Sequence, residues 1–115
     1  MAITRIEPGK RLSGAVVHNG IVYLSGQVAD NPKGDIAAQT QDVLRKIDGL
    51  LAKAGTDKSK LLSVQIFLTD MRHFAAMNQA WEAWVDGGNP PARATTQAAL
   101  ANPDLLVEIM AVAAK

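Results

Sequence analysis

The C-terminal run from Leu105 to Ala113 constrains the fold of this chain more than any other stretch. The run is apolar at every position except Glu108. An apolar run of this length is typical of a strand that is covered on both faces. Asn102-Pro103-Asp104 before it is a turn signal, because proline fixes φ and the Asn and Asp side chains can bond nearby backbone. The run therefore predicts a buried strand with a single carboxylate inside it.

Arg93 opens the strand that is expected before this run. Pro90-Pro91 forces extended backbone ahead of the arginine, and Thr95 and Thr96 favour a strand after it. A planar guanidinium can bind both oxygens of a small carboxylate. Surface arginines that only pair with a neighbouring acid are the commoner case. The residue alone therefore leaves both interpretations open.

Glu108 is the other charged residue that needs an explanation. It shares one face of its strand with Met110 and Val112, while Val107 and Ile109 point the other way. An ionised carboxylate on an apolar face is costly unless it is paired or used. Two interpretations follow: the glutamate pairs with a lysine or arginine across an interface, or it holds a water for attack on a substrate.

The first third of the chain predicts strands. Ile3 to Ile6 alternates apolar and polar side chains, and Asn19-Gly20 between two β-branched runs is the strongest short signal for a hairpin. The hairpin leads into Ser25-Gly26, where the glycine indicates a bulge or the close approach of a ligand or another backbone. The serine is equally consistent with a polar residue that closes a strand.

Two amphipathic segments predict helices, with a strand from Leu62 to Thr69 between them. Asp35 is placed to cap the first helix, and Gly55 to end it in a left-handed conformation. Asp70 is placed to cap the second helix, and Gly87-Gly88 stops it. In the intervening strand one face is assigned to Leu62, Val64, Ile66 and Leu68. The apolar stripes are Ile36, Val43, Ile47, Leu50, Leu51 and Ala54 in the first helix, and Phe74, Met77, Trp81, Trp84 and Val85 in the second.

The resulting order is ββαβαββ, preceded by the short strand at Ile3 to Ile6. This order predicts a two-layer α+β domain over residues 1–115, with both helices on one face of a mixed sheet. Trp81 and Trp84 are interpreted as core residues, not as stacking platforms. Strands that are apolar on both faces in so small a domain indicate that partner subunits cover the second face.

Composition excludes several classes of function. The 12 basic and 11 acidic residues give a net charge of +1, which offers no bulk attraction for nucleic acid or an acidic membrane. The chain has no cysteine, so disulfides, thiolate metal sites and cysteine nucleophiles are excluded. His18 and His73 lack metal-ligand spacing. Neither a signal peptide nor an apolar run of membrane-spanning length is visible, and a cytoplasmic domain without metal or cofactor is expected.

The C-terminal residues resemble a known family. Pro91-Ala92-Arg93, the short strand and turn after it, and Val-Glu-Ile-Met-Ala-Val-Ala at 107–113 are similar to the C-terminal signature of the RidA/YjgF family. The similarity extends over essentially the whole chain. Members are small trimeric proteins with a chorismate-mutase-like fold, and many are enamine/imine deaminases. The resemblance implies a homotrimer that hydrolyses 2-imino or enamine acids, of the 2-aminoacrylate type, to 2-oxo acids and ammonium without a cofactor.

The resemblance also implies which residues form the site. Arg93 falls on the substrate-binding arginine, and Glu108 falls on the glutamate that orients a water. Ser25 and Gly26 match the Ser-Gly that lines the same pocket, and Asn78 matches an asparagine on the second helix. We expect Arg93 and Glu108 to line one cleft, with the question of one subunit or two left open.

Two positions depart from the family pattern. Leu12 stands where the deaminases carry a tyrosine that caps the pocket, so a phenolic donor is lost. Thr95 stands where they often carry a cysteine, whose main contribution resembles a backbone N–H to the substrate carboxylate, and threonine can provide the same group. The loss of the phenol keeps a non-catalytic carboxylate-binding or chaperone-like trimer as the alternative. RNA cleavage ranks third, because no paired general acid and base is visible.

Overall fold

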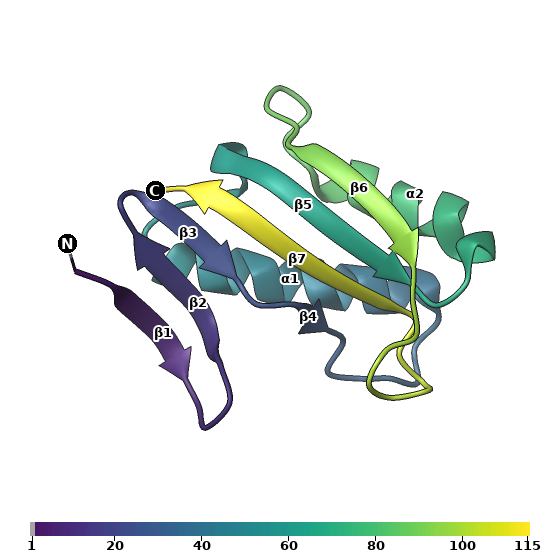
Figure 1. Ribbon diagram of the computed structural model, residues 1–115. Coiled ribbons are helices and arrows are strands. Elements are labelled where there is room, and N and C mark those ends of the chain that lie inside the picture. Colours follow the sequence, from purple (N-terminus) through teal and green to yellow (C-terminus); the bar gives the residue numbers. More distant parts are fainter. Residues whose placement is uncertain (1) are drawn as a thin grey trace.

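The strand that contains Glu108 lies inside a mixed sheet, and the helices cover one side of that sheet. The computed structural model describes residues 2–115 (Figure 1), so Met1, the first residue of the predicted domain, lies outside the described residues. This architecture confirms the predicted two-layer α+β fold, including the additional first strand. The elements are β1 (Thr4–Pro8), β2 (Ser13–His18), β3 (Ile21–Leu24), β4 (Gln27–Val28), α1 (Ile36–Lys53), β5 (Leu61–Leu68), α2 (Phe74–Trp84), β6 (Ala92–Gln97) and β7 (Val107–Ala114), with 3₁₀ turns η1 (Lys58–Lys60) and η2 (Met71–His73).

The sheet has the strand order β1-β2-β3-β7-β5-β6, and the short β4 also pairs with β7. The β5–β6 pair is parallel, whereas the β1–β2, β2–β3, β3–β7, β4–β7 and β5–β7 pairs are antiparallel. The apolar run therefore occupies the interior of the sheet, and β6 is an edge strand. The sequence did not predict β4, because a strand of 2 residues is too short to show an alternating pattern.

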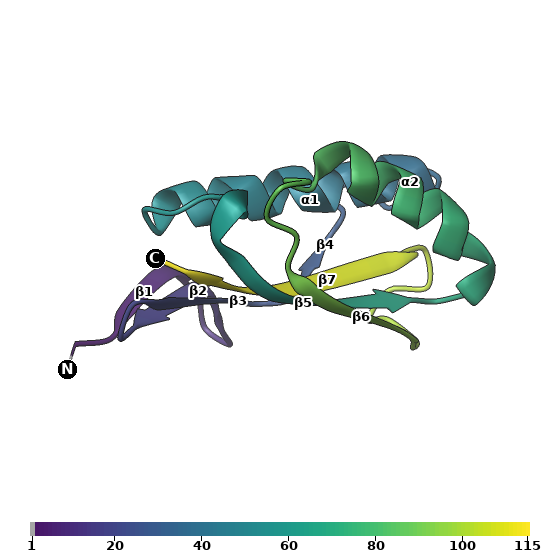
Figure 2. The ribbon, with the colours of Figure 1, turned by 90° about the horizontal axis from the view of Figure 1, so that it is seen from above.

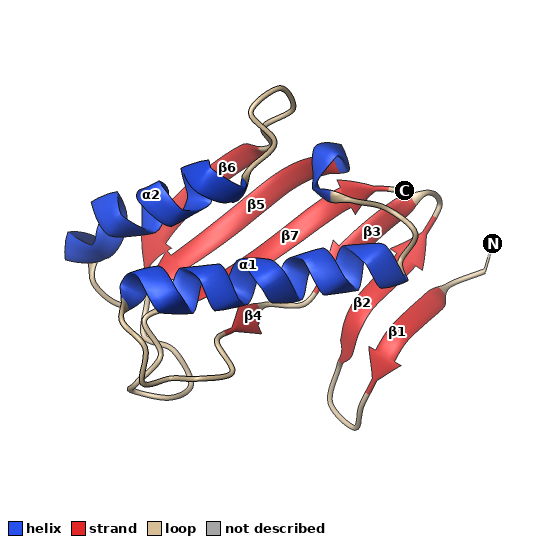
Figure 3. Cartoon of the chain, turned by 180° about the vertical axis from the view of Figure 1, so that it is seen from behind, coloured by secondary structure: helices blue, strands red, loops and turns tan. Residues whose placement is uncertain are grey.

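Both helices lie on the same face of the sheet (Figures 2 and 3). Val107, Ile109, Ala111 and Ala113 of β7 are buried beneath them, as are the predicted stripe residues of α1. On the opposite face Met110 of β7 is exposed in the single chain. No element of residues 2–115 packs on this second face, so its cover by partner subunits stays a prediction.

The hairpin turn and the two ends of α1 are formed by the turn and capping residues that the sequence predicted. Asn19 and Gly20 adopt φ values of 52° and 77°, which are the left-handed values that a tight hairpin turn requires. Asp35 accepts a hydrogen bond from the Ala38 N–H at 2.9 Å, and so caps α1. Gly55 follows α1 with φ of 82°, which only glycine adopts without strain.

Three local predictions are wrong for reasons that depend on neighbouring residues. A register shift between Leu61 and Ser63 places Leu61 inward, and leaves Leu62 47% exposed. Asp70 caps η2 through the Arg72 N–H, whereas α2 starts at Phe74 without a side-chain cap. Phe74 consequently lies at the helix start and is 39% exposed, outside the core.

Replacement of Asp35 by Ala should lower the free energy of unfolding by about 1 kcal/mol, because α1 loses the acceptor for its Ala38 N–H. Denaturant unfolding at a fixed protein concentration would measure the change. Asp35→Asn is the matched control, since asparagine keeps a capping oxygen. Equal losses for the two variants would contradict the capping role.

Neither α1 nor α2 is long and apolar enough to span a membrane, and the same holds for the short 3₁₀ turns within residues 2–115.

Candidate functional site

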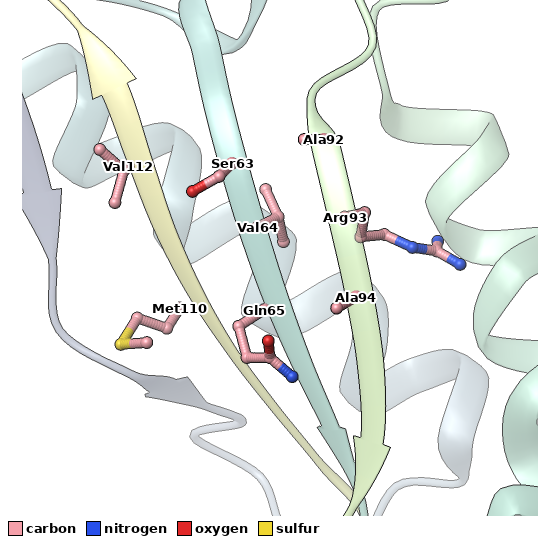
Figure 4. A pocket seen from close by; sticks show the side chains of 8 residues that line it. All are labelled: Ser63, Val64, Gln65, Ala92, Arg93, Ala94, Met110 and Val112. Carbon is pink, nitrogen blue, oxygen red and sulfur yellow. The ribbon is translucent and has the colours of Figure 1, made fainter.

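Arg93 projects toward α2 from the edge strand β6. In the parallel register it lies beside Val64, whose side chain is buried beneath the helices. Figure 4 shows the Arg93 side chain directed away from β5 and toward α2. Its Cζ lies 5.3 Å from the centre of the Trp81 ring, a distance at which a cation is attracted to the ring face. Trp81 is therefore a core residue, as predicted, that also supports the arginine.

The Arg93 guanidinium has no acidic partner within residues 2–115. Burial lowers the pKa of Arg93 from its ordinary value, and the charge of Glu82 acts in the opposite direction. An arginine stays protonated in proteins, so a half-buried cation with five donors is left unpaired. The ion pairs among the described residues are Arg45–Asp42, Lys46–Asp30, Lys53–Glu7 and Arg72–Asp70.

Thr95 adds two further unused donors beside Arg93. Ala98 N–H donates to Leu68 O at 2.9 Å across the β5–β6 pair. Because successive N–H groups of a strand point to opposite sides, the Thr95 N–H faces the free edge of β6. The Thr95 hydroxyl oxygen is buried without a hydrogen-bond partner among residues 2–115. A guanidinium next to free N–H and O–H groups is suited to binding a carboxylate.

Asn78 belongs to the same part of the molecule. It lies on α2 one turn before Trp81, so the two side chains share a side of the helix. Asn78 is half-buried. We call Arg93, Thr95 and Asn78 the arginine half-site.

Glu108 points away from the helices. It lies between Val28 of β4 and Phe67 of β5 in the sheet, on the face opposite Val107 and Ile109. The side chain is half-buried, and none of the ion pairs named above includes it. No cation among residues 2–115 pairs with Glu108, so its pairing with a lysine or arginine across an interface and its role in holding a water both stay predictions.

Gly26 leaves the space that the Glu108 carboxylate occupies. A Cβ added at Gly26 would lie 2.9 Å from Glu108 Cδ and closer still to Oε2. Among residues 2–115 the glycines with left-handed φ are Gly20 and Gly55. The backbone conformation at position 26 therefore does not require a glycine. The sequence predicted a bulge or the approach of a ligand or another backbone at this glycine, whereas the group that comes close is a side chain of the same protomer.

Ser25 already makes hydrogen bonds within the protomer through its backbone N–H and its hydroxyl. Its backbone N–H and its hydroxyl both donate to Gly14 O, at 3.0 Å and 3.1 Å, and its Oγ accepts from Gln27 Nε2 at 3.1 Å. A hydroxyl has one hydrogen and two lone pairs. Ser25 can therefore accept one more hydrogen bond, but it cannot donate to a ligand without releasing Gly14. We call Ser25, Gly26 and Glu108 the glutamate half-site, and Gln27 is a supporting residue that sequence reasoning missed.

Leu12 lies in the loop between β1 and β2 and is 62% exposed. The loop is closed by a hydrogen bond from Gly9 N–H to Leu12 O at 2.8 Å. Gly14, which holds Ser25, follows two residues later. Leu12 thus belongs to a loop beside the glutamate half-site, and its apolar side chain brings no donor there.

The two half-sites are separate in one protomer. Glu108 lies across from Phe67, which lies across from Thr96, so Glu108 and β6 are two strands apart. Two inter-strand spacings amount to roughly 10 Å, and Arg93 and Glu108 also point to opposite faces of the sheet. The expected common cleft is therefore not formed within a single chain.

A hollow of about 300 Å³ on the open face does not join them either. Figure 4 shows that the Arg93 guanidinium points away from the Met110 and Gln65 side chains at this hollow. Its lining residues are Ser63, Val64, Gln65, Ala92, Arg93, Ala94, Met110 and Val112, and Glu108 is not among them. Among residues 2–115, no three His, Asp or Glu side chains come together in a way that could hold a metal ion.

Comparison with known proteins identifies the family. Residues 2–115 match the family model described as Endoribonuclease L-PSP. The chain belongs to this L-PSP family. A RutC family protein of Haemophilus influenzae is 48% identical over 114 residues, which are 98% of each chain. The RutC family protein YoaB of Escherichia coli is 47% identical over 99% of each chain.

Solved structures of the L-PSP family agree with the fold. A member of the YjgF protein family from Neisseria meningitidis superposes with a TM-score of 0.97 at 45% identity, over 100% of this chain and 96% of that one. The match confirms the RidA/YjgF resemblance and the arrangement of two helices on a mixed sheet.

Proposed function

We propose that this member of the L-PSP family hydrolyses 2-imino or enamine acids, of the 2-aminoacrylate type, to 2-oxo acids and ammonium. The reaction would need no cofactor and would take place in clefts between the protomers of a homotrimer. The observation that carries the proposal is the pair of half-sites on separate surfaces of one protomer. Each holds a charged group that has no ion-pair partner among residues 2–115. A second copy of the chain can place its glutamate half-site beside the arginine half-site of the first copy.

The arginine half-site would bind the substrate carboxylate. The guanidinium supplies two parallel N–H donors, and the Thr95 N–H at the free edge of β6 supplies a third. Trp81 holds the guanidinium from one side and so limits its rotamers. Asn78, one turn away on α2, would border the same group. Fixing the carboxylate orients the imine carbon for attack.

The glutamate half-site would supply the water. Glu108 accepts a proton from a water as its oxygen bonds to the carbon of the protonated imine. The remaining lone pair of Ser25 Oγ can accept a hydrogen bond from the iminium N–H. Return of the proton from Glu108 to the amino nitrogen makes ammonia the leaving group, and the C–N bond breaks as the hydroxyl oxygen forms the new carbonyl. Glu108 accepts the hydroxyl proton and passes it to the departing ammonia, which leaves as ammonium. The products are a 2-oxo acid and ammonium, so atoms and charge balance.

The proposal is tested by the rate of 2-oxo-acid release from an enzymatically generated 2-imino acid, with the solution mass measured by light scattering on the same sample. We expect release above the spontaneous rate and the mass of a trimer. A monomer that is fully active would contradict the shared cleft. Binding of a 2-oxo acid without turnover would instead support the carboxylate-binding alternative. RNA cleavage that persists after stringent repurification would favour ribonuclease activity, which is the third alternative.

Leu12→Tyr should raise kcat/KM for this reaction by about fivefold, the equivalent of one net hydrogen bond of about 1 kcal/mol. The reason is that Leu12 is an exposed apolar residue in the loop beside the glutamate half-site, where a phenol would provide a donor. Initial rates of 2-oxo-acid release measure the effect. Leu12→Phe is the matched control, because it adds the ring without the hydroxyl, and an equal gain from both variants would exclude the hydrogen bond.

A further inference from the structure

The Glu108 carboxylate fills the place that a side chain at position 26 would need. A Cβ at Gly26 would approach Glu108 Cγ to 3.3 Å and Cδ to 2.9 Å, with Oε2 closer still. Real Cβ atoms do not tolerate such contacts, so one of the two groups would have to move. Gly26 has no left-handed φ, which removes the usual conformational reason for a glycine.

The sheet register explains why the two residues meet. Gln27 lies across from Ile109 and Val28 lies across from Glu108 in the β4–β7 pair. Gly26 therefore precedes β4 on the same face as Glu108, diagonally across the pair, where a long side chain can reach it. The Glu108 carboxylate lies over bare backbone at this point.

The backbone around Gly26 is fixed from both sides. Ser25 is held to Gly14 O by its N–H and its hydroxyl, and Gln27 Nε2 donates to both Ser25 O and Ser25 Oγ at 3.1 Å. On the other side, Gln27 and Val28 pair with β7. A new methyl group at position 26 would therefore displace the flexible end of Glu108, because the backbone is the more strongly held of the two.

We infer that Gly26 is a positioning residue for Glu108: its missing side chain is what lets the carboxylate lie at the glutamate half-site. The role in turnover rests on the proposed function, whereas the placement of Glu108 does not. A change at Gly26 should act through Glu108 and not through contact with the substrate.

The placement is tested by a crystal structure of the Gly26→Ala protein in whatever oligomeric state it adopts. We expect Glu108 in a different side-chain rotamer, with β4 and Ser25 in their original positions. Gly87→Ala is the matched control, since a Cβ there meets nothing within 4 Å and leaves Glu108 alone. A Gly26→Ala structure in which Glu108 keeps its rotamer and the backbone shifts would overturn the inference. This readout needs no activity, so it stands even if imine hydrolysis is absent.

Kinetics test the consequence for catalysis. Gly26→Ala should lower kcat about tenfold or more with little change in KM, because the carboxylate is misplaced while the arginine half-site is intact. In the Glu108→Gln background the same substitution should have no further effect. Gly87→Ala should leave the rate unchanged. An equal loss from Gly26→Ala in both backgrounds would mean that Gly26 acts independently of Glu108, and would overturn the inference.

Discussion

Arg93→Ala is expected to lower kcat/KM for 2-imino-acid hydrolysis by about 100- to 1,000-fold, which corresponds to the loss of two charge-assisted hydrogen bonds of about 1.5–2 kcal/mol each. The carboxylate is bound in the ground state as well as in the transition state, so much of the loss should be a higher KM. Initial rates over a range of imine concentrations, together with calorimetric binding of the 2-oxo-acid product, would measure it.

Two control variants make the Arg93 experiment specific. Arg93→Lys keeps the charge but loses the planar fork, and should fall between the wild type and the alanine variant. Arg72→Ala removes an exposed arginine that pairs with Asp70 on η2, and should retain full activity. The fold should tolerate Arg93→Ala, because no acid among residues 2–115 pairs with Arg93 and would be left without a partner. Equal rates for wild type and Arg93→Ala would refute carboxylate binding by this residue.

Glu108→Gln should lower kcat about 100- to 10,000-fold, the range expected for the loss of a general base. Glutamine has the same shape and still fits over Gly26, so KM for the imine and the thermal stability should change little. Single-turnover measurements of 2-oxo-acid formation would separate the chemical step from binding and product release.

The matched control for Glu108→Gln is Asp104→Asn, which neutralises an exposed acid in the turn before β7. It should leave kcat near the wild-type value. If Glu108→Gln retained full kcat while still binding the 2-oxo acid, a water activated by Glu108 would be ruled out, and the carboxylate-binding alternative would gain support.

Sequence reasoning predicted the parts of the fold that depend on local chemistry. Asn19-Gly20 and Gly55 reveal their conformations through the types of residue that tolerate positive φ. Asp35 reveals a helix start through its capping oxygen. Leu62 and Phe74 were assigned to the core incorrectly, because a register shift and a 3₁₀ turn depend on how neighbouring segments pack.

The candidate site also depends on contacts between distant segments, which the sequence does not predict. The residue types of Arg93 and Glu108 suggest their chemistry, but the face that each occupies depends on pairing with β5 and β7. The contacts of Ser25 with Gly14, and of Gly26 with Glu108, join residues distant in sequence. No periodic pattern reports such contacts. That the two half-sites meet across a subunit boundary stays a proposal.

The placement of Arg93 and Glu108 on opposite faces of the sheet has a consequence for regulation. If neither surface is competent alone, a newly made protomer is inert, and turnover begins only when copies have associated. The rate of hydrolysis would then rise more steeply than in proportion to the concentration of the protein. A substitution that prevents the protomers from associating, far from Arg93 and Glu108, would abolish activity as completely as the loss of either charged residue.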